Sequence, residues 1–84
     1  MDICSLICEI VNENPGINAI ELTAKILKLT LERLGTIPNM DFMEAIDRAV
    51  FTKHILEVEY VTPQMNYRIK SLYFPAGTEI TVKN

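Results

Sequence analysis

The chain has 84 residues, of which 49% are hydrophobic, and a formal net charge of −3. This length allows one domain, and the composition is too apolar and too weakly charged for a disordered protein. The sequence has no run of about 18 apolar residues that would span a membrane, and no basic N-terminal region of the kind that begins a secretory signal. We therefore expect a soluble, cytoplasmic domain, and the net charge alone gives no support to nucleic-acid binding.

The two cysteines, Cys4 and Cys8, are four residues apart in an apolar segment. Side chains at this spacing share one face of a helix, so both can approach a single metal ion. A closed zinc site needs four ligands, however, and His54 is the only histidine of the chain. We therefore interpret both cysteines as free thiols in a reducing compartment, and we expect no metal and no cofactor.

The first helix is predicted over residues 2–14. Asp2 is suited to the N-cap position, and Asn14-Pro15-Gly16 ends the helix, because proline restricts the residue before it and glycine permits a turn. The apolar residues of this segment recur at the spacing of one helix face: Ile3, Ile7, Ile10 and Val11, with Leu6 at the edge.

The second helix is predicted over residues 18–34, with Asn18 as its N-cap and Gly35 as its C-cap. It is apolar on most of its circumference, so it must be covered on two sides. One stripe consists of Ile20, Ala24, Leu27, Leu31 and Leu34, and a second, on nearly the opposite side, consists of Leu22, Ile26 and Leu29. Either the neighbouring helices cover both stripes, or a partner covers what they leave. The second stripe is our candidate interface, and a homodimer through this helix is possible.

The third helix is predicted over residues about 40–53. Its inner face consists of Phe42, Ile46, Ala49 and Val50, and its outer face carries Glu44, Arg48 and Phe51. Two positions of Phe51 stay open, either tucked under the segment that follows or exposed as an interface anchor. His54 is expected to adopt the left-handed conformation that often ends a helix.

Residues 55–74 alternate in polarity and predict a β-hairpin, with its turn at Thr62–Met65. We predict the register in which Val58 faces Ile69. It places Glu59 opposite Arg68 and Glu57 opposite Lys70, so that apolar pairs share one face and opposite charges share the other. Residues 75–84 are expected to form a further turn and a short strand.

Three helices followed by a hairpin make an α+β protein, and this is the element order of the winged helix-turn-helix domain. Residues 10–26 resemble the first helix, turn and second helix of many bacterial winged-helix regulators. Residues 50–60 are similar to the junction of recognition helix and wing, and residues 67–69 resemble the returning wing strand. The resemblance covers most of residues 3–74, and we expect a single domain over residues 1–84. The second helix continues about two turns beyond what this family normally uses.

This resemblance implies a DNA-binding transcriptional regulator of bacterial or phage type, with the third helix in the major groove and the wing on the phosphates or in the minor groove. The residues it nominates for contact with double-stranded DNA are Arg48, Thr52, Lys53, Gln64, Asn66, Arg68 and Lys70. Positive charge is in excess over residues 25–33 and from residue 60 to the end. The third helix is acidic overall, however, and the predicted glutamate partners of Arg68 and Lys70 also weaken the case for phosphate binding.

The alternative is a winged-helix protein-interaction module, an adaptor or an inhibitor, that does not bind DNA. Its contact residues would be Leu22, Ile26 and Leu29 of the second stripe, or Phe51. The sequence contains no nucleophile elbow, no glycine-rich phosphate loop and no pair of carboxylates at catalytic spacing, so we do not expect an enzyme.

Overall fold

The computed structural model describes the backbone of residues 2–62 and 68–79, and the side chains of residues 2–59 and 71–79. The elements follow in the order α1 (Ile3–Glu13), β1 (Ile17–Asn18), α2 (Ala19–Leu34), α3 (Phe42–Phe51), β2 (Ile55–Thr62) and β3 (Arg68–Pro75). The three predicted helices are confirmed to within two residues at each end, and so is the α+β class. No helix in the described part of the chain is long and apolar enough to cross a membrane.

Each helix begins where a side-chain oxygen accepts a hydrogen bond from a backbone N–H of its first turn. These capping residues are Asp2 for α1, Asn18 for α2 and Asp41 for α3. The helix α2 ends at Gly35, which has a left-handed φ of 74° and donates its N–H to Leu31 O. The predicted caps Asp2, Asn18 and Gly35 are thus confirmed.

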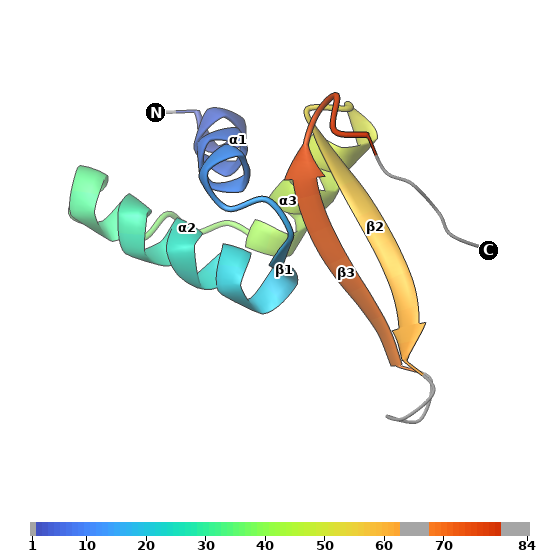
Figure 1. Ribbon diagram of the computed structural model, residues 1–84. Helices are drawn as coiled ribbons and strands as arrows, with labels where there is room; N and C mark the ends of the chain where they lie inside the picture. The colour runs from blue at the N-terminus through green and yellow to red at the C-terminus, as the bar shows by residue number, and fades with distance from the viewer. Residues whose placement is uncertain (1, 63–67, 80–84) are drawn as a thin grey trace.

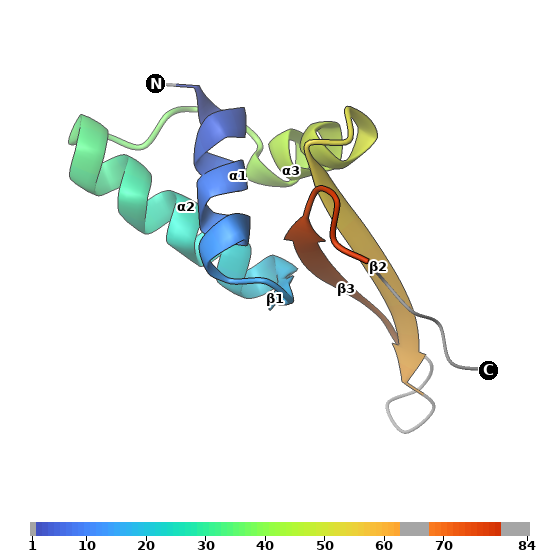
Figure 2. The same cartoon turned by 45° about the horizontal axis from the view of Figure 1, so that its top comes forward.

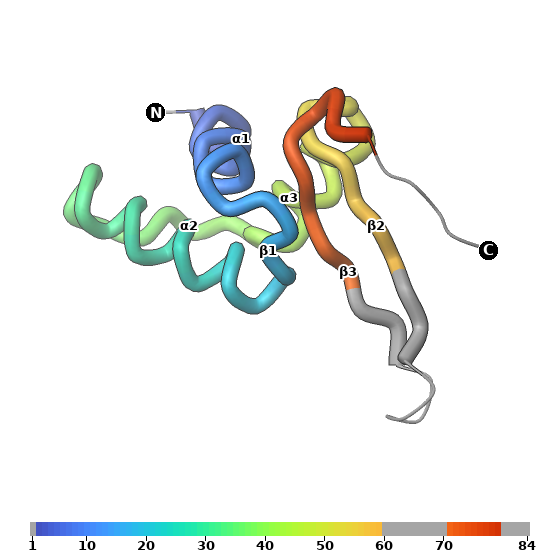
Figure 3. The backbone as a smooth tube through the Cα atoms, in the orientation of Figure 1, coloured from blue at the N-terminus to red at the C-terminus, as the bar shows by residue number. Residues whose placement is uncertain are grey.

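The short strand β1 was not predicted from the sequence. It pairs antiparallel with β3, Ile17 with Tyr73 and Asn18 with Leu72, and the sheet order is β1-β3-β2 (Figure 1). Asn18 is both the last residue of β1 and the N-cap of α2, so the chain passes from strand to helix without a loop (Figure 3). Pairing of β1 with β3 therefore fixes how α2 is rotated about its own axis.

The predicted register of the hairpin is wrong by three residues. The structure pairs Val58 with Leu72 and Glu57 with Tyr73. Tyr73 is 1% exposed, and its hydroxyl donates to Glu57 Oε2 at 3.1 Å. Burial of a whole aromatic ring stabilises the fold by more than exposed ion pairs do, and the observed register achieves that burial.

In this register Arg68 lies opposite Thr62 and Lys70 opposite Tyr60. The predicted turn at Thr62–Met65 falls mainly on residues 63–67, outside the described residues, as does the expected strand after residue 79. The turn after β3 is confirmed, because the N–H and Oγ1 of Thr78 both donate to Pro75 O.

The core lies where α1 crosses α2 and where both helices meet α3 and the sheet (Figure 2). Leu22 and Ile26 are fully buried there, and Leu29 packs against the same cluster. The prediction that this stripe is an exposed interface is therefore wrong. The buried residues of the cluster are Leu6, Ile7, Ile10, Val11, Ile17, Leu22, Ile26, Ile46, Ala49, Ile55 and Tyr73.

The last turn of α2 is held to α1 by a two-pronged ion pair. Arg33 Nη2 donates to Glu9 Oε1 at 2.8 Å, and Nη1 donates to Oε2 at 3.1 Å. The hydrogen bonds from Arg33 lower the pKa of Glu9. Both side chains are partly exposed, so the contact serves mainly to orient α2 against α1.

Candidate functional site

The surface of α3 that points away from the core is the first candidate site. We call Met43, Glu44, Asp47, Arg48 and Phe51 the outer face of α3; all five are exposed. On the opposite side of the helix, Ile46 and Ala49 are buried and Phe42 and Val50 pack against the core, as predicted. The helix therefore presents one continuous face to solvent.

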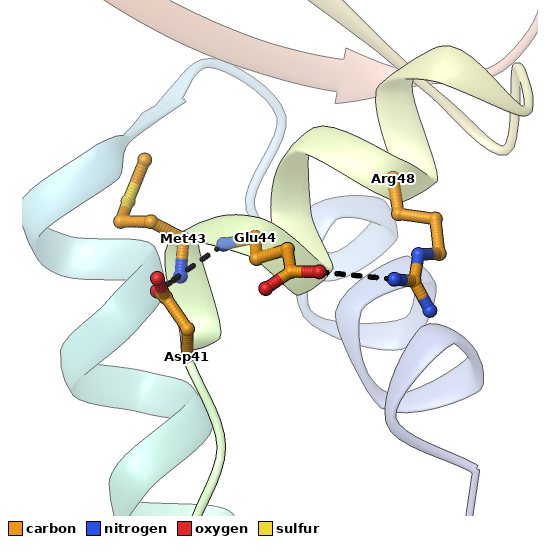
Figure 4. A network of polar contacts seen from close by, with 4 residues as sticks. All are labelled: Asp41, Met43, Glu44 and Arg48. Atoms are coloured by element: carbon orange, nitrogen blue, oxygen red, sulfur yellow. Dashed lines mark hydrogen bonds and ion pairs between the residues drawn. The ribbon is translucent and has the colours of Figure 1, made fainter.

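The single cation of this outer face is paired with a carboxylate. Arg48 Nη2 donates to Glu44 Oε1 at 3.1 Å, one helical turn away (Figure 4). Asp47 adds a further negative charge, and Asp41 at the N-cap adds another while it accepts from the N–H groups of Met43 and Glu44. The outer face of α3 thus lacks an unpaired cation and is net acidic.

The polar residues at the end of α3 serve the backbone. Thr52 Oγ1 donates to Arg48 O at 2.9 Å and lies 2.6 Å from His54 Nδ1. The N–H of Lys53 donates to Val50 O and that of His54 to Ala49 O, the pattern of a Schellman motif. In this motif the residue before the last donor is left-handed, and that residue is Lys53, with φ 64°. The prediction of a left-handed His54 is wrong, because the Schellman motif places the left-handed residue one position earlier, at Lys53.

Of the other residues nominated for DNA, Gln64 and Asn66 lie outside the described residues. Arg68 and Lys70 have described backbone positions on β3, and their side chains lie outside the described part. The predicted partners of these two cations face elsewhere: Glu57 is paired with Tyr73, and Glu59 with Ser71. The structure thus brings Arg48, Thr52 and Lys53 together at the end of α3, and its strand register places the backbone of Arg68 opposite Thr62 and that of Lys70 opposite Tyr60.

Phe51 is 87% exposed, so of the two predicted positions the one under the hairpin is wrong. It belongs to a set of large apolar side chains that face solvent. Within the described residues these are Ile20, Leu31, Leu34, Ile37, Met40, Met43 and Phe51, all on α2, on the connection from α2 to α3, or on α3. Among the described side chains, the large exposed apolar residues are therefore concentrated on α2, on α3 and on the connection between them.

The second candidate surface is the stripe of α2 that the core does not use. We call Ile20, Ala24, Leu27, Leu31 and Leu34 the α2 stripe. Ile20 is 83% exposed, Leu31 50% and Leu34 48%, and Leu27 is half-buried. Both stripes are apolar in the sequence, and the choice between them depends on the strand β1, which has only two residues and leaves almost no pattern.

A shallow groove of about 380 Å³ joins the α2 stripe to α3. It is lined by Ala19, Ile20, Thr23, Ala24, Leu27 and Met43, which are almost wholly apolar at the surface. The side chain of Met43 extends toward α2, and Thr23 Oγ1 lies 3.9 Å from its sulfur (Figure 4). The small side chain of Ala24 leaves room in this groove for an apolar side chain from outside.

A second hollow of about 440 Å³ lies between α1 and α3, and its lining includes Cys4 and His54. Both cysteines are half-buried free thiols, as predicted. Burial and the neighbouring Cys4 raise the pKa of Cys8, which keeps that thiol protonated at neutral pH. Among the described side chains, no three metal-ligating groups come together.

Two surfaces thus emerge as candidates, the net acidic outer face of α3 and the apolar α2 stripe, and neither offers the excess of positive charge that phosphate binding requires. Comparisons of the chain with protein-family models, with curated proteins and with solved structures found no match.

Proposed function

We propose that the chain is a winged-helix domain that acts as a protein-interaction module. The order of three helices followed by a hairpin supports the fold, as does the short connection of residues 52–54 between α3 and β2. In such a domain α3 occupies the position of the recognition helix, and β2 with β3 forms the wing. The function then depends on what the outer face of α3 can bind.

One observation carries the proposal: α3 exposes an aromatic ring where a DNA-reading helix needs cations. Phe51 is 87% exposed, and Arg48 is already paired with Glu44. Aromatic residues and methionine are enriched in protein interfaces, whereas DNA affinity depends on unpaired lysine and arginine. Because the face is net acidic, its partner is a protein with an apolar pocket for Phe51 and basic side chains around that pocket.

A photo-reactive phenylalanine analogue at position 51 tests this proposal in cells that produce the protein. We expect a discrete protein adduct, and the purified partner should bind the wild-type chain in solution. Phe51→Ser should weaken that binding by at least about 30-fold, the loss expected for an aromatic hot spot. Ile37→Ser, a change at another exposed apolar residue, is the matched control and should bind normally. Adducts with nucleic acid, or equal binding by Phe51→Ser, would contradict the proposal.

DNA binding through the wing is the second candidate, and the observed register favours it. The uncharged residues Thr62 and Tyr60, and not Glu59 and Glu57, occupy the register positions opposite Arg68 and Lys70. Gel retardation of duplex DNA at low salt and micromolar protein tests this candidate. If it holds, retardation decreases steeply with added salt, and Arg68→Ala weakens binding to all sequences alike. No retardation of any duplex would exclude it.

A further inference from the structure

We propose that the α2 stripe binds a second copy of this chain, with the two α2 helices antiparallel across a two-fold axis. This surface is separate from the outer face of α3, apart from Met43 at the shared groove. The inference therefore does not depend on what Phe51 binds. It replaces the prediction of a dimer through Leu22, Ile26 and Leu29, because Leu22 and Ile26 are core residues and Leu29 packs against the core.

The spacing of the α2 stripe is that of a helix that pairs with another helix. Ile20, Ala24, Leu27, Leu31 and Leu34 follow one another at intervals of four, three, four and three. This is the a/d pattern that forms the contact line of a coiled coil. In the structure the opposite side of α2 contacts the core, so Ile20, Leu31 and Leu34 remain exposed at the two ends of the stripe and Leu27 is half-buried at its centre.

The groove at Ala24 fits a leucine of a second copy. In an antiparallel pair, Ala24 of each chain lies opposite Leu27 of the other, and Ile20 lies opposite Leu31. The leucine enters the space left by the small alanine, between Ile20 and Met43, as a knob enters a hole. A two-fold axis repeats this contact, so one kind of side chain fills both grooves.

The charges beside the stripe select the antiparallel orientation. Glu21 and Lys28 border it on one side, both are exposed, and neither forms an ion pair with another described residue. In the antiparallel pair, Glu21 of each copy lies near Lys28 of the other, which gives two attractive contacts. In a parallel pair, Lys28 would instead face the uncharged Thr23. The other border of the stripe consists of Thr23 and Met43. Both are uncharged, so they cause no electrostatic repulsion between the two copies.

The size of the contact predicts a weak dimer. The helix α2 has 16 residues and is therefore about 24 Å long at about 1.5 Å per residue. One pair of helices this long buries less than the roughly 1,600 Å² of a standard stable interface. We therefore expect a dissociation constant in the micromolar range or above, and the test uses protein concentrations in that range.

Sedimentation equilibrium from about 10 µM to about 1 mM tests the dimer. The mass should rise from 9.6 kDa toward twice that value as concentration increases. Leu27→Lys should keep the chain monomeric at every concentration and leave its far-UV circular dichroism unchanged, because Leu27 is only half-buried in the monomer and lies outside the core cluster. Asn12→Lys, at an exposed residue of α1, and Phe51→Ser should both dimerise as the wild type does. A wild-type chain that stays monomeric, or a Leu27→Lys chain that still dimerises, would overturn the proposal.

Charge exchange tests the orientation. Glu21→Lys and Lys28→Glu should each weaken self-association at least about tenfold, because each places like charges opposite one another. An equimolar mixture of these two variants should form a heterodimer, since one chain then presents two lysines and the other two glutamates. The chain with both substitutions should dimerise again. If mixing does not restore association, the antiparallel arrangement is wrong.

Discussion

Thr30 is a polar residue in the core whose hydroxyl forms no hydrogen bond with the described residues. It is fully buried on α2, and its Oγ1 has no hydrogen-bond partner among the described residues. Valine has the same shape without the polar group, so Thr30→Val should raise the free energy of unfolding by about 1 kcal/mol. Urea denaturation measures the change. Thr23→Val is the control: it removes a hydroxyl that donates to Ala19 O at 2.8 Å, and it should not stabilise the chain. A less stable Thr30→Val chain would show that this hydroxyl is satisfied in solution.

Tyr73 makes the stability of the fold sensitive to alkaline pH. Burial, and then the negative charge of Glu57, raise the pKa of its phenol well above the usual value of about 10. At a pH between the usual tyrosine pKa and the raised pKa of Tyr73, the folded chain keeps a proton that the unfolded chain releases. The free energy of unfolding therefore falls as the pH rises above about 10. Below that pH the contribution is fully present.

Tyr73→Phe separates this effect from the other groups that titrate at high pH. At pH 7 the variant should be less stable by about 1 kcal/mol, because Glu57 loses the hydrogen bond from the phenol. Between about pH 9 and pH 11 it should lose less stability than the wild type, because the perturbed phenol is gone. Chemical denaturation over this pH range provides both values. Parallel curves for the two chains would rule out a perturbed Tyr73.

At the scale of elements, the junction of α3 and β2 contains the one residue of the described backbone, other than glycine, that has a positive φ. Lys53 has φ 64°, which costs a side-chain-bearing residue about 1 kcal/mol relative to glycine. Lys53→Gly should therefore raise the thermal unfolding temperature by several degrees. Gly35→Ala, at φ 74° with no atom crowding its Cβ position, should lower it by a similar amount. A destabilised Lys53→Gly chain would mean that the lysine side chain contributes more than its backbone costs.

The sequence was sufficient for the three helices and the two longer strands, and insufficient for β1 and for the contacts between the elements. Helical periodicity and capping residues are local, so Asp2, Asn18 and Gly35 marked helix ends correctly. Cross-strand pairs alone predict another register for the hairpin, whereas the position of Tyr73 in the core decides it. The exposed side of α2 depends on the pairing of β1 with β3, and a strand of two residues leaves almost no pattern in a sequence.

At the scale of the whole molecule, the fold and the candidate surfaces depend on different apolar residues. The core uses one side of α2 and the inner side of α3, and the side chains turned outward add apolar surface exposed to water. The 49% of residues that are hydrophobic thus include both core residues and exposed residues, and composition alone does not distinguish the two sets. For the same reason the net charge of −3 says little about α3, where an acidic excess and an ion pair coexist on one face.

This separation predicts that the outward apolar residues can be replaced without loss of the fold. Ile20 and Phe51 are 83% and 87% exposed, so the double variant Ile20→Ser and Phe51→Ser should keep its free energy of unfolding to within about 0.5 kcal/mol. Its solubility, measured by precipitation with polyethylene glycol, should rise, because two large apolar groups leave the surface. Ile46→Ser, at a fully buried residue of α3, is the control and should unfold the chain. A loss of more than about 2 kcal/mol in the double variant would mean that Ile20 and Phe51 contribute to the core in solution, and would remove the basis for treating both surfaces as binding sites.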